Sequence, residues 1–389
     1  MEYTTNYLED PFKGSDSDYG VDREKYINET LYDIPCDSSH HASSLQELLS
    51  LVEKLRDSPG IKKIMLSDID LHIGSEMYAL NFNNLENFIF EGAKITVRDF
   101  TSGIAFRNCR NISLRNINFT YDVPMYASGS VISSTLNSVT LRLFAPYTAD
   151  TFLKDNSNSQ KIYNSLFEKE LIAEYLEYEE GTNIPREGGN QKYNNYNEGS
   201  VGPKLAIAGH TVLDNQTVRV EFNDTINPPP TGTIVSMAFT MYQCPGILFE
   251  KCENIYLENV EINQVPGMAI NFTTTRNINI NRIKIRSKIE EHQYLTLTAD
   301  GLHIKNCMGK VKITNSLLEG SHDNALNIAG MYLEVCKVDE NSAWVKAHLG
   351  MWGTHVPLVG DILEVRIGST LAFKENTNCS RWKNRMILC

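Results

Sequence analysis

The sequence predicts an all-β protein and, within that class, a right-handed parallel β-helix, a solenoid of stacked coils. Three observations support this fold. Short apolar runs of alternating pattern recur along the chain, corners containing Asn or Gly separate them, and the aligned runs recur at intervals of 23 or 24 residues. Coils of about 20–30 residues that cannot bury a core alone are typical of solenoids.

Four stretches align, and they begin at Ile104, Ile247, Ile270 and Leu302. Alternation directs every second side chain into the core, and the corners need residues that tolerate left-handed backbone dihedrals. Ile270 and Leu302 are 32 residues apart, which indicates one coil with an outward loop near residues 288–294. A leucine-rich repeat is excluded because it requires a denser leucine consensus.

A short helix is expected before the first coils. Ser44 and Glu47 have the spacing of a capping box, and residues 58–60 (Ser-Pro-Gly) end the segment. The apolar residues between them follow helical intervals: Leu48, Leu49, Val52 and Leu55. Such a helix would cover the first open coil of the solenoid.

We divide the chain into three parts. Residues 1–40 are an irregular N-terminal segment, and residues 41–330 are the β-helix, with an excursion at about 145–200 that is rich in Asn, Glu and Tyr. Residues 331–389 are expected to be a small, partial β-barrel-like domain. Its alternating strands, at 332–336, 343–346 and 361–365, do not follow the coil period.

Composition limits the partners. The net charge is -12 and no run of Lys and Arg occurs, so nucleic acid is not expected to bind. No apolar stretch approaches the ~20 residues of a membrane helix, so no membrane partner is expected. The first five residues lack the basic and apolar regions of a secretory signal, which leaves a cytoplasmic protein or a secreted one without its true N-terminus.

The eight cysteines form no C-x-x-C pair. Cys109, Cys252 and Cys307 occupy equivalent positions of the repeat, so we expect reduced thiols packed in the core. No metal and no cofactor are predicted.

Two neighbouring corners carry acids. Asn324 follows Asp300 by 24 residues, so it lies beside Asp300 in the next coil, and Asp323 is one residue and one coil away. Coil and strand spacings place the two Asp Cα atoms about 6 Å apart, which allows the carboxylates the ~6.5–9.5 Å separation of inverting glycoside hydrolysis. Such neighbours are expected to move their pKa values apart, as an acid and a base require. The structural alternative is that these residues only satisfy corner backbone groups.

The motifs around these acids resemble the family 110 glycoside hydrolases. They are the stretches 299–303 (Ala-Asp-Gly-Leu-His) and 318–330 (Leu-Glu-Gly-Ser-His-Asp-Asn-Ala-Leu-Asn-Ile-Ala-Gly), with further similarity at 108–116 and 121–124. That family consists of inverting α-1,3-galactosidases built as β-helices with inserted β-barrel domains. The resemblance spans roughly residues 40–370 and is most specific near residues 300 and 323.

The resemblance implies that Asp300 is the general acid and that Asp323 is the first of two adjacent acids that activate the water. Asn324 stands where the family has the second acid, and Ala329 stands where it has a His. An Asn cannot accept a proton, so Asp323 would act as the sole base. The implied substrate is an oligosaccharide or glycan with a terminal α-linked galactose, hydrolysed without a cofactor.

Further residues are expected to bind substrate, each with a structural alternative. His303 lies beside Asp300, and Asp122 either is a corner residue or lines the same site. The remaining ones are Asn324, Asn327 and His322. Trp352 and Tyr294 could stack on a sugar face, although ordinary packing is favoured.

Two other functions stay open. A non-catalytic carbohydrate-binding β-helix is favoured by Asn324 and Ala329. A polygalacturonase-like hydrolase ranks lower because residues 282–284 (Arg-Ile-Lys) precede the acids and no Gly-His-Gly follows them.

Overall fold

The computed structural model describes residues 38–71, 78–98, 102–122, 126–149, 174–192, 207–238 and 245–330, with four strands between 334 and 378. The chain forms two compact units, one of residues 34–329 and one that combines residues 1–33 with 330–389. Trp352, which the sequence suggested for sugar stacking, lies outside the described residues.

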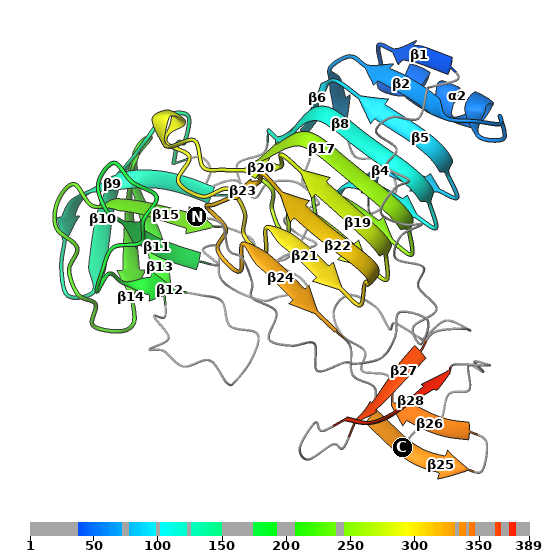
Figure 1. Ribbon diagram of the computed structural model, residues 1–389. Helices are drawn as coiled ribbons and strands as arrows, with labels where there is room; N and C mark the ends of the chain where they lie inside the picture. Colours follow the sequence, from blue (N-terminus) through cyan, green and yellow to red (C-terminus); the bar gives the residue numbers. More distant parts are fainter. Residues whose placement is uncertain are drawn as a thin grey trace. The chain divides into compact units, whose positions relative to one another are not determined.

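The larger unit confirms the all-β class, because two long parallel sheets make up most of it (Figure 1). The eleven-stranded sheet contains β1 (Ser38–Ala42), β2 (Lys62–Leu66), β3 (Ile69–Leu71), β5 (Glu86–Glu91), β6 (Lys94–Val97), β8 (Arg110–Tyr121), β17 (Glu253–Asn263), β19 (Arg276–Asn281), β20 (Lys284–Ile285), β22 (Met308–Thr314) and β23 (Leu317–Leu318). The six-stranded sheet has the order β24 (Leu326–Ala329), β21 (Leu302–Lys305), β18 (Ile270–Thr273), β16 (Ile247–Glu250), β7 (Ser102–Arg107) and β4 (Tyr78–Asn83).

Successive repeats pair in parallel in both sheets, in the register that the sequence alignment predicted. Ile247 pairs with Ile104 on one side and Ile270 on the other, and Ile270 pairs in turn with Leu302. The long repeat before Leu302 contains the expected outward loop, with a short 3-10 helix, η2 (Ile289–Glu291). The alignment of the four stretches is therefore confirmed.

Identical side chains stack in the core and at the corners. The rings of Phe106, Phe249 and Phe272 are nearly parallel, with centroids 5.0 and 5.2 Å apart. At one corner, each Asn amide nitrogen donates to the amide oxygen of the Asn one repeat earlier, at 2.6, 2.8 and 3.0 Å. These four residues have φ between 54 and 61°, which Asn tolerates: Asn87, Asn111, Asn254 and Asn277.

The N-terminal helix is α2 (Leu45–Leu55), as expected, and Ser44 Oγ accepts a hydrogen bond from the backbone N of Glu47. Leu48, Val52 and Leu55 are buried in the same core as the first strands. Leu49 was expected on this apolar face but is 41% exposed. The reason is geometric: position 49 is rotated by about 100° from Leu48 and therefore turns away from the core.

The cysteines in the described part of the chain are free thiols, as expected: Cys109, Cys252, Cys307 and Cys336. Cys109 and Cys252 are buried in consecutive repeats, where Cys252 Sγ donates to the carbonyl oxygen of Phe106 at 3.3 Å. Their role is packing.

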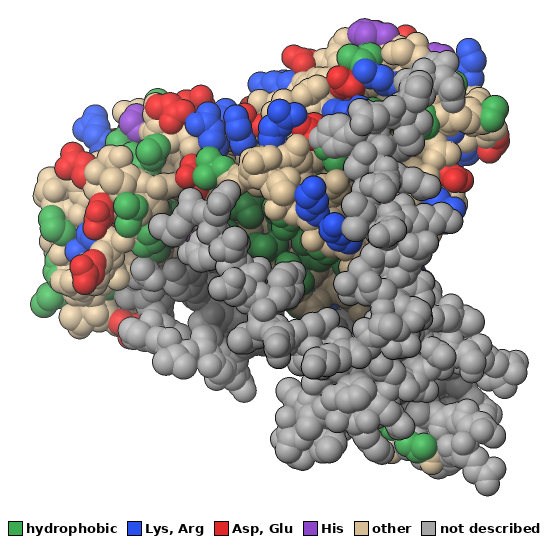
Figure 2. Space-filling view, viewed as in Figure 1, with side chains coloured by type: hydrophobic (Ala, Val, Ile, Leu, Met, Phe, Trp, Pro, Cys, Tyr) green, Lys and Arg blue, Asp and Glu red, His purple; other side chains and the backbone are tan. Residues whose placement is uncertain are grey.

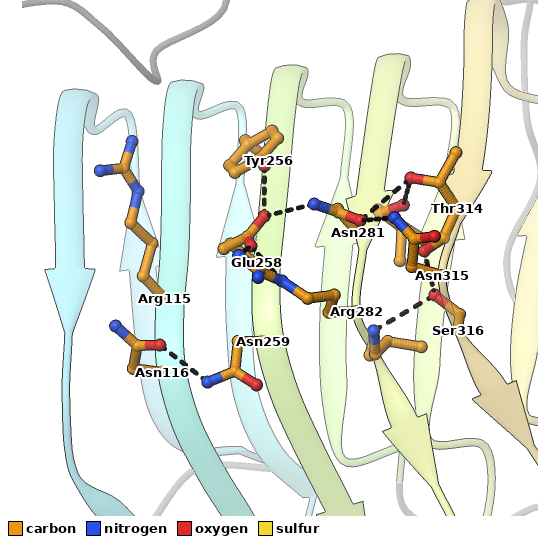
Figure 3. Close-up of polar contacts among 12 residues, drawn as sticks. Arg115, Asn116, Tyr256, Glu258, Asn259, Asn281, Arg282, Thr314, Asn315 and Ser316 are labelled. Carbon is orange, nitrogen blue, oxygen red and sulfur yellow. Dashed lines mark hydrogen bonds and ion pairs between the residues drawn. The ribbon is translucent and has the colours of Figure 1, made fainter.

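The outer face of the eleven-stranded sheet carries a polar cluster (Figure 3). Tyr256 and Glu258 alternate with the core residues Ile255 and Leu257 and therefore point away from the core. Although it faces outward, Glu258 is only 5% exposed. Its carboxylate accepts from Tyr256 Oη at 2.5 Å and from Asn281 Nδ2 at 3.0 Å, and it pairs with the Arg282 guanidinium, whose Nε lies at 2.7 Å.

A seven-stranded antiparallel sheet is inserted between β8 and β16, in the order β12, β11, β15, β9, β10, β14, β13. Its strands are β9 (Tyr126–Ser134), β10 (Ser138–Leu143), β11 (Glu174–Tyr178), β12 (Gln191–Lys192), β13 (Ile207–Asp214), β14 (Thr217–Phe222) and β15 (Ile234–Ala238). The sequence reading missed most of this sheet, because it treated only residues 145–200 as an excursion. The alternation of β9, β10 and β14 resembles that of the repeats, so it did not reveal antiparallel pairing.

The outward loop contacts this inserted sheet. The ring of His292 stacks on Phe144 at 4.2 Å, and Tyr294 lies against Phe144 and Tyr178. Tyr294 is 5% exposed, so ordinary packing, the favoured alternative, accounts for it.

The smaller unit contains two antiparallel hairpins, β25 (Glu334–Asp339) with β26 (Ser342–Lys346) and β27 (Ile362–Arg366) with β28 (Phe373–Asn378). No helix in the described part of the chain is long and apolar enough to cross a membrane. On the face shown in Figure 2, Lys and Arg side chains lie among Asp and Glu side chains.

Candidate active site

The predicted acids lie on a turn that three consecutive repeats share. Val265 is bridged to Leu297, and Leu297 to Ser321, at the start of each turn. Five residues later, Ile270, Leu302 and Leu326 pair in adjacent strands. Because the three turns have equal length, Asp300 and Asn324 occupy equivalent positions in neighbouring repeats, as the 24-residue spacing predicted.

Small residues allow these turns to approach closely. A Cβ atom on Gly301 would lie 2.4 Å from the carbonyl oxygen of Ala325, and one on Gly246 would lie 2.8 Å from that of Ala269. The backbone N of Gly301 donates to the carbonyl oxygen of Asn324 at 2.9 Å. This contact holds the acidic corner of one repeat against the next.

Asp300 is the centre of the site and is only 2% exposed. Its Oδ2 lies 2.5 Å from His303 Nδ1 and 3.2 Å from Asn327 Nδ2. Its Oδ1 accepts from the backbone N of Asn324 at 3.2 Å and from Asn324 Nδ2 at 3.3 Å. Four donors from two repeats therefore surround one carboxylate.

These contacts determine the charge of Asp300. Burial acts to raise the pKa of Asp300, but the hydrogen bond and charge of His303, with the hydrogen bonds of Asn327 and Asn324, lower that pKa below its ordinary value. Asp300 is therefore ionised at neutral pH. The sequence analysis expected the two neighbouring acids to move their pKa values apart; the lowered pKa of Asp300 arises instead from His303 and from the amides of Asn327 and Asn324.

Asp323 lies on the other side of Asn324 and is exposed. Its Oδ1 accepts from the backbone N of Asn324 at 2.9 Å and from Asn324 Nδ2 at 3.0 Å. The backbone N of Asn324 thus donates to both carboxylates, and its two distances, 3.2 and 2.9 Å, limit the separation of the two Oδ1 atoms to 6.1 Å or less. Asn324 therefore bridges Asp300 and Asp323, and it holds the two Oδ1 atoms closer together than the ~6.5–9.5 Å that the sequence analysis expected.

The structure brings His303, Asn324 and Asn327 together around Asp300, with Asp323 attached through Asn324. His322 lies beside this group in sequence, and burial of its ring lowers its pKa to about 3, so it is neutral at physiological pH. Asp122 lies elsewhere: it pairs with Arg98, which also bonds Asp70 at 3.0 Å. Among the described contacts, none joins Asp122 to Asp300.

Sequence reasoning missed one residue of this neighbourhood, Asn271. It pairs with His303 in the adjacent strand, and His303 pairs with Asn327, so the three side chains form one row on the six-stranded sheet. The signal was present in the aligned repeats, since Asn271 follows Ile270 as His303 follows Leu302.

The described residues include no group of three or more His, Cys, Asp or Glu side chains that could hold a metal ion. The cluster instead combines two carboxylates, an imidazole and neutral amides, which suits acid–base chemistry and hydrogen bonding to hydroxyl groups.

Comparisons with known proteins agree with these motifs. The chain is 23% identical over 322 residues to alpha-1,3-galactosidase B of Parabacteroides distasonis, which covers 81% of this chain and 50% of that protein. It is 31% identical over 143 residues to alpha-1,3-galactosidase B of Phocaeicola vulgatus, covering 36% of this chain and 24% of that protein. For alpha-1,3-galactosidase A of Shewanella woodyi the identity is 22% over 258 residues, covering 66% and 39%.

The chain therefore spans about half the length, or less, of these curated relatives. No family model matches it. The region shared with the P. distasonis protein nevertheless covers 81% of this chain, so the similarity is not confined to the two corner motifs. The similarity supports the resemblance seen in the motifs: this chain is a family-110-like protein, related to the α-1,3-galactosidases.

Proposed function

We propose that this chain is an α-galactosidase-type glycoside hydrolase that removes terminal α-linked galactose from a glycan, and that its repeats wind as a right-handed parallel β-helix. The observation that carries the proposal is the bridge of Asn324 between Asp300 and Asp323. The two Oδ1 atoms, at most 6.1 Å apart, can reach a single sugar, but this separation is shorter than the ~6.5–9.5 Å typical of inverting enzymes, so the anomer of the first product is the deciding test of the stereochemistry. The similarity to proteins named α-1,3-galactosidases supplies the substrate class.

In the proposed inverting mechanism, Asp323 removes a proton from the attacking water and Asp300 delivers a proton to the leaving oxygen. Asp323 suits the base because it is exposed and can reach solvent. Asp300 must first acquire a proton, since its pKa is lowered. In its imidazolium form, His303 can supply that proton from Nδ1, 2.5 Å from Oδ2, as the glycosidic bond breaks, and it is left as a neutral imidazole. Asp323 then releases to solvent the proton it took from water, and His303 takes up one proton, so the cycle closes with no net gain or loss.

The experiment is hydrolysis of nitrophenyl α-galactoside and of a B-type oligosaccharide. The wild type should release galactose, and Asp300→Asn and Asp323→Asn should each lose at least about 100-fold in rate. Asp122→Asn is a matched control that should keep its activity, because Asp122 belongs to the Arg98 ion pair. Proton NMR of the first product should show the β-anomer. Release at the wild-type rate by both site variants would refute the assignment, and the α-anomer would refute inversion.

A second candidate is a non-catalytic carbohydrate-binding protein. The lowered pKa of Asp300 and the amide of Asn324 at the family's second acid favour it, because both reduce acid–base capacity. Binding of α-galactosides by the wild-type protein without turnover would select this candidate.

A further inference from the structure

The row of polar side chains beside Asp300 extends one repeat beyond the residues assigned so far. Asn327, His303 and Asn271 are consecutive partners on three adjacent parallel strands, β24, β21 and β18. Neighbouring strands lie about 4.8 Å apart, and paired residues project from the same face of the sheet. Asn271 therefore lies about one strand spacing from His303, on the side opposite Asn327.

The amide of Asn271 is oriented by its own strand. Thr273 Oγ1 donates to Asn271 Oδ1 at 3.1 Å, which directs the Nδ2 group away from Thr273. Among the described residues, no atom accepts a hydrogen bond from this Nδ2, whereas the corresponding Nδ2 of Asn327 donates to Asp300. Asn271 is also only 3% exposed. A nearly buried amide thus retains two N–H donors that are not used within the described structure.

Two other polar atoms near Asp300 are unsatisfied in the described structure. Thr298 Oγ1, two residues before Asp300, and His303 Nε2 are buried and make no hydrogen bond. An unpaired buried polar atom destabilises the folded state, so folded proteins rarely retain several close together. Thr298 and His303 lie on either side of Asp300 in sequence, and together with the unused donor of Asn271 they indicate a place where an external polar molecule completes the hydrogen bonding.

We propose that Asn271 is a substrate-binding residue whose Nδ2 donates to a hydroxyl group of the galactose ring held against Asp300. This inference rests on the proposed function and adds a contact to it. A pyranose ring is about as wide as one strand spacing, so a sugar beside Asp300 reaches the next strand. A neutral donor with a fixed direction suits a hydroxyl oxygen and gives no advantage to a charged ligand.

The test compares Asn271→Ala with the control Asn279→Ala. Asn279 belongs to the same repeat but lies on β19, in the other sheet, where it pairs with Tyr256 and Lys312. Asn271→Ala should weaken galactoside binding about 3- to 10-fold, measured as KM and as the Kd of galactose by NMR, because one hydrogen bond to a neutral ligand is lost. Asn279→Ala should match the wild type.

A set of galactosides that each lack one hydroxyl group distinguishes direct contact from a structural role. With the wild type, the galactoside that lacks the contacted hydroxyl group should bind about 3- to 10-fold more weakly than the intact galactoside. With Asn271→Ala, that same compound should bind as well as the intact galactoside. If Asn271→Ala does not fold, Asn271→Ser takes its place in the same series. Equal losses of every deoxy sugar in wild type and variant would overturn the contact.

The outcomes also separate this inference from the proposed hydrolysis. Wild-type turnover with an unchanged KM and Kd in Asn271→Ala would overturn the role of Asn271 and leave the hydrolase intact. Galactose binding that depends on Asn271, without turnover, would overturn hydrolysis and support the contact. Absence of both binding and turnover in the wild type would overturn both.

Discussion

Replacing Asn324 by Asp tests how the carboxylate cluster is held together. In the structure, Asn324 Nδ2 donates to Asp300 Oδ1 at 3.3 Å and to Asp323 Oδ1 at 3.0 Å. Asn324→Asp removes these donors and places a third carboxylate at the same position. It also restores the second acid that the family resemblance implies at position 324.

The expected magnitude follows from the distance. Two like charges 3.3 Å apart repel by about 1 kcal/mol at a dielectric constant of 80 and by about 5 kcal/mol at 20. Asn324 is exposed but Asp300 is buried, so an intermediate value of about 2–3 kcal/mol is appropriate. This repulsion raises the pKa of one carboxyl group of the variant.

The sign of the pH dependence is fixed by linkage. A carboxyl group whose folded-state pKa is raised binds its proton more tightly in the folded protein than in the unfolded one. The variant therefore loses stability as the pH rises from about 4 to the raised pKa, and the loss is complete above that pKa. The melting temperature of Asn324→Asp should therefore fall below that of the wild type by several degrees at pH 8 and approach it at pH 4. Asn279→Asp, on the other sheet, is the charge control. A deficit that does not change with pH would refute the reasoning.

Three further predictions concern the same unit. The ionised, hydrogen-bonded Asp300 stabilises the folded protein above its unfolded-state pKa of about 4, and Asp300→Asn should remove this contribution. The difference in the free energy of unfolding between wild type and variant should therefore shrink as the pH falls below about 4. Gly301→Ala should destabilise by at least about 2 kcal/mol in chemical denaturation because its Cβ would meet the Ala325 carbonyl oxygen at 2.4 Å; Gly209→Ala, with nothing within 4 Å, should be nearly neutral. Glu258→Ala should cost about 1–3 kcal/mol, because Tyr256 Oη and Asn281 Nδ2 lose the buried acceptor they share. Glu253→Ala at the exposed Arg110 pair should cost at most about 1 kcal/mol, and equal costs would contradict this ranking.

The sequence predicted the repeat register and the neighbours of Asp300 because both depend on one quantity, the length of the repeat. When 24 residues separate two positions and the turns are equally long, the positions must lie side by side. The same reasoning would have found Asn271. It failed for Asp122, because the repeat length gives a corner position and does not say which charged partner the side chain selects; Arg98, one repeat earlier, binds Asp122 instead.

The ionisation of Asp300 and the inserted sheet could not be predicted in this way. The pKa of Asp300 depends on the orientations of the His303 ring and of the Asn327 and Asn324 amides, and a repeat pattern carries no information about side-chain orientation. The inserted strands alternate like the strands of the repeats, and their pairing partners lie up to about a hundred residues away, as β9 with β15 shows. A local pattern determines that a segment is a strand, but long-range packing determines its partner.

The corner that carries the acids is also a corner where the repeats lie too close for a Cβ atom, and this coincidence has a physical consequence. Gly246 and Gly301 lack the Cβ atoms that would meet the next repeat. Only with this close contact can Asn324, from one repeat, reach the carboxylate of Asp300 in the preceding repeat. The small residues thus position Asp300 and Asp323 although they touch no substrate. It follows that Gly301→Ala should reduce activity even under conditions in which the variant remains folded, and that lowering the temperature, which restores folding, should not restore the rate.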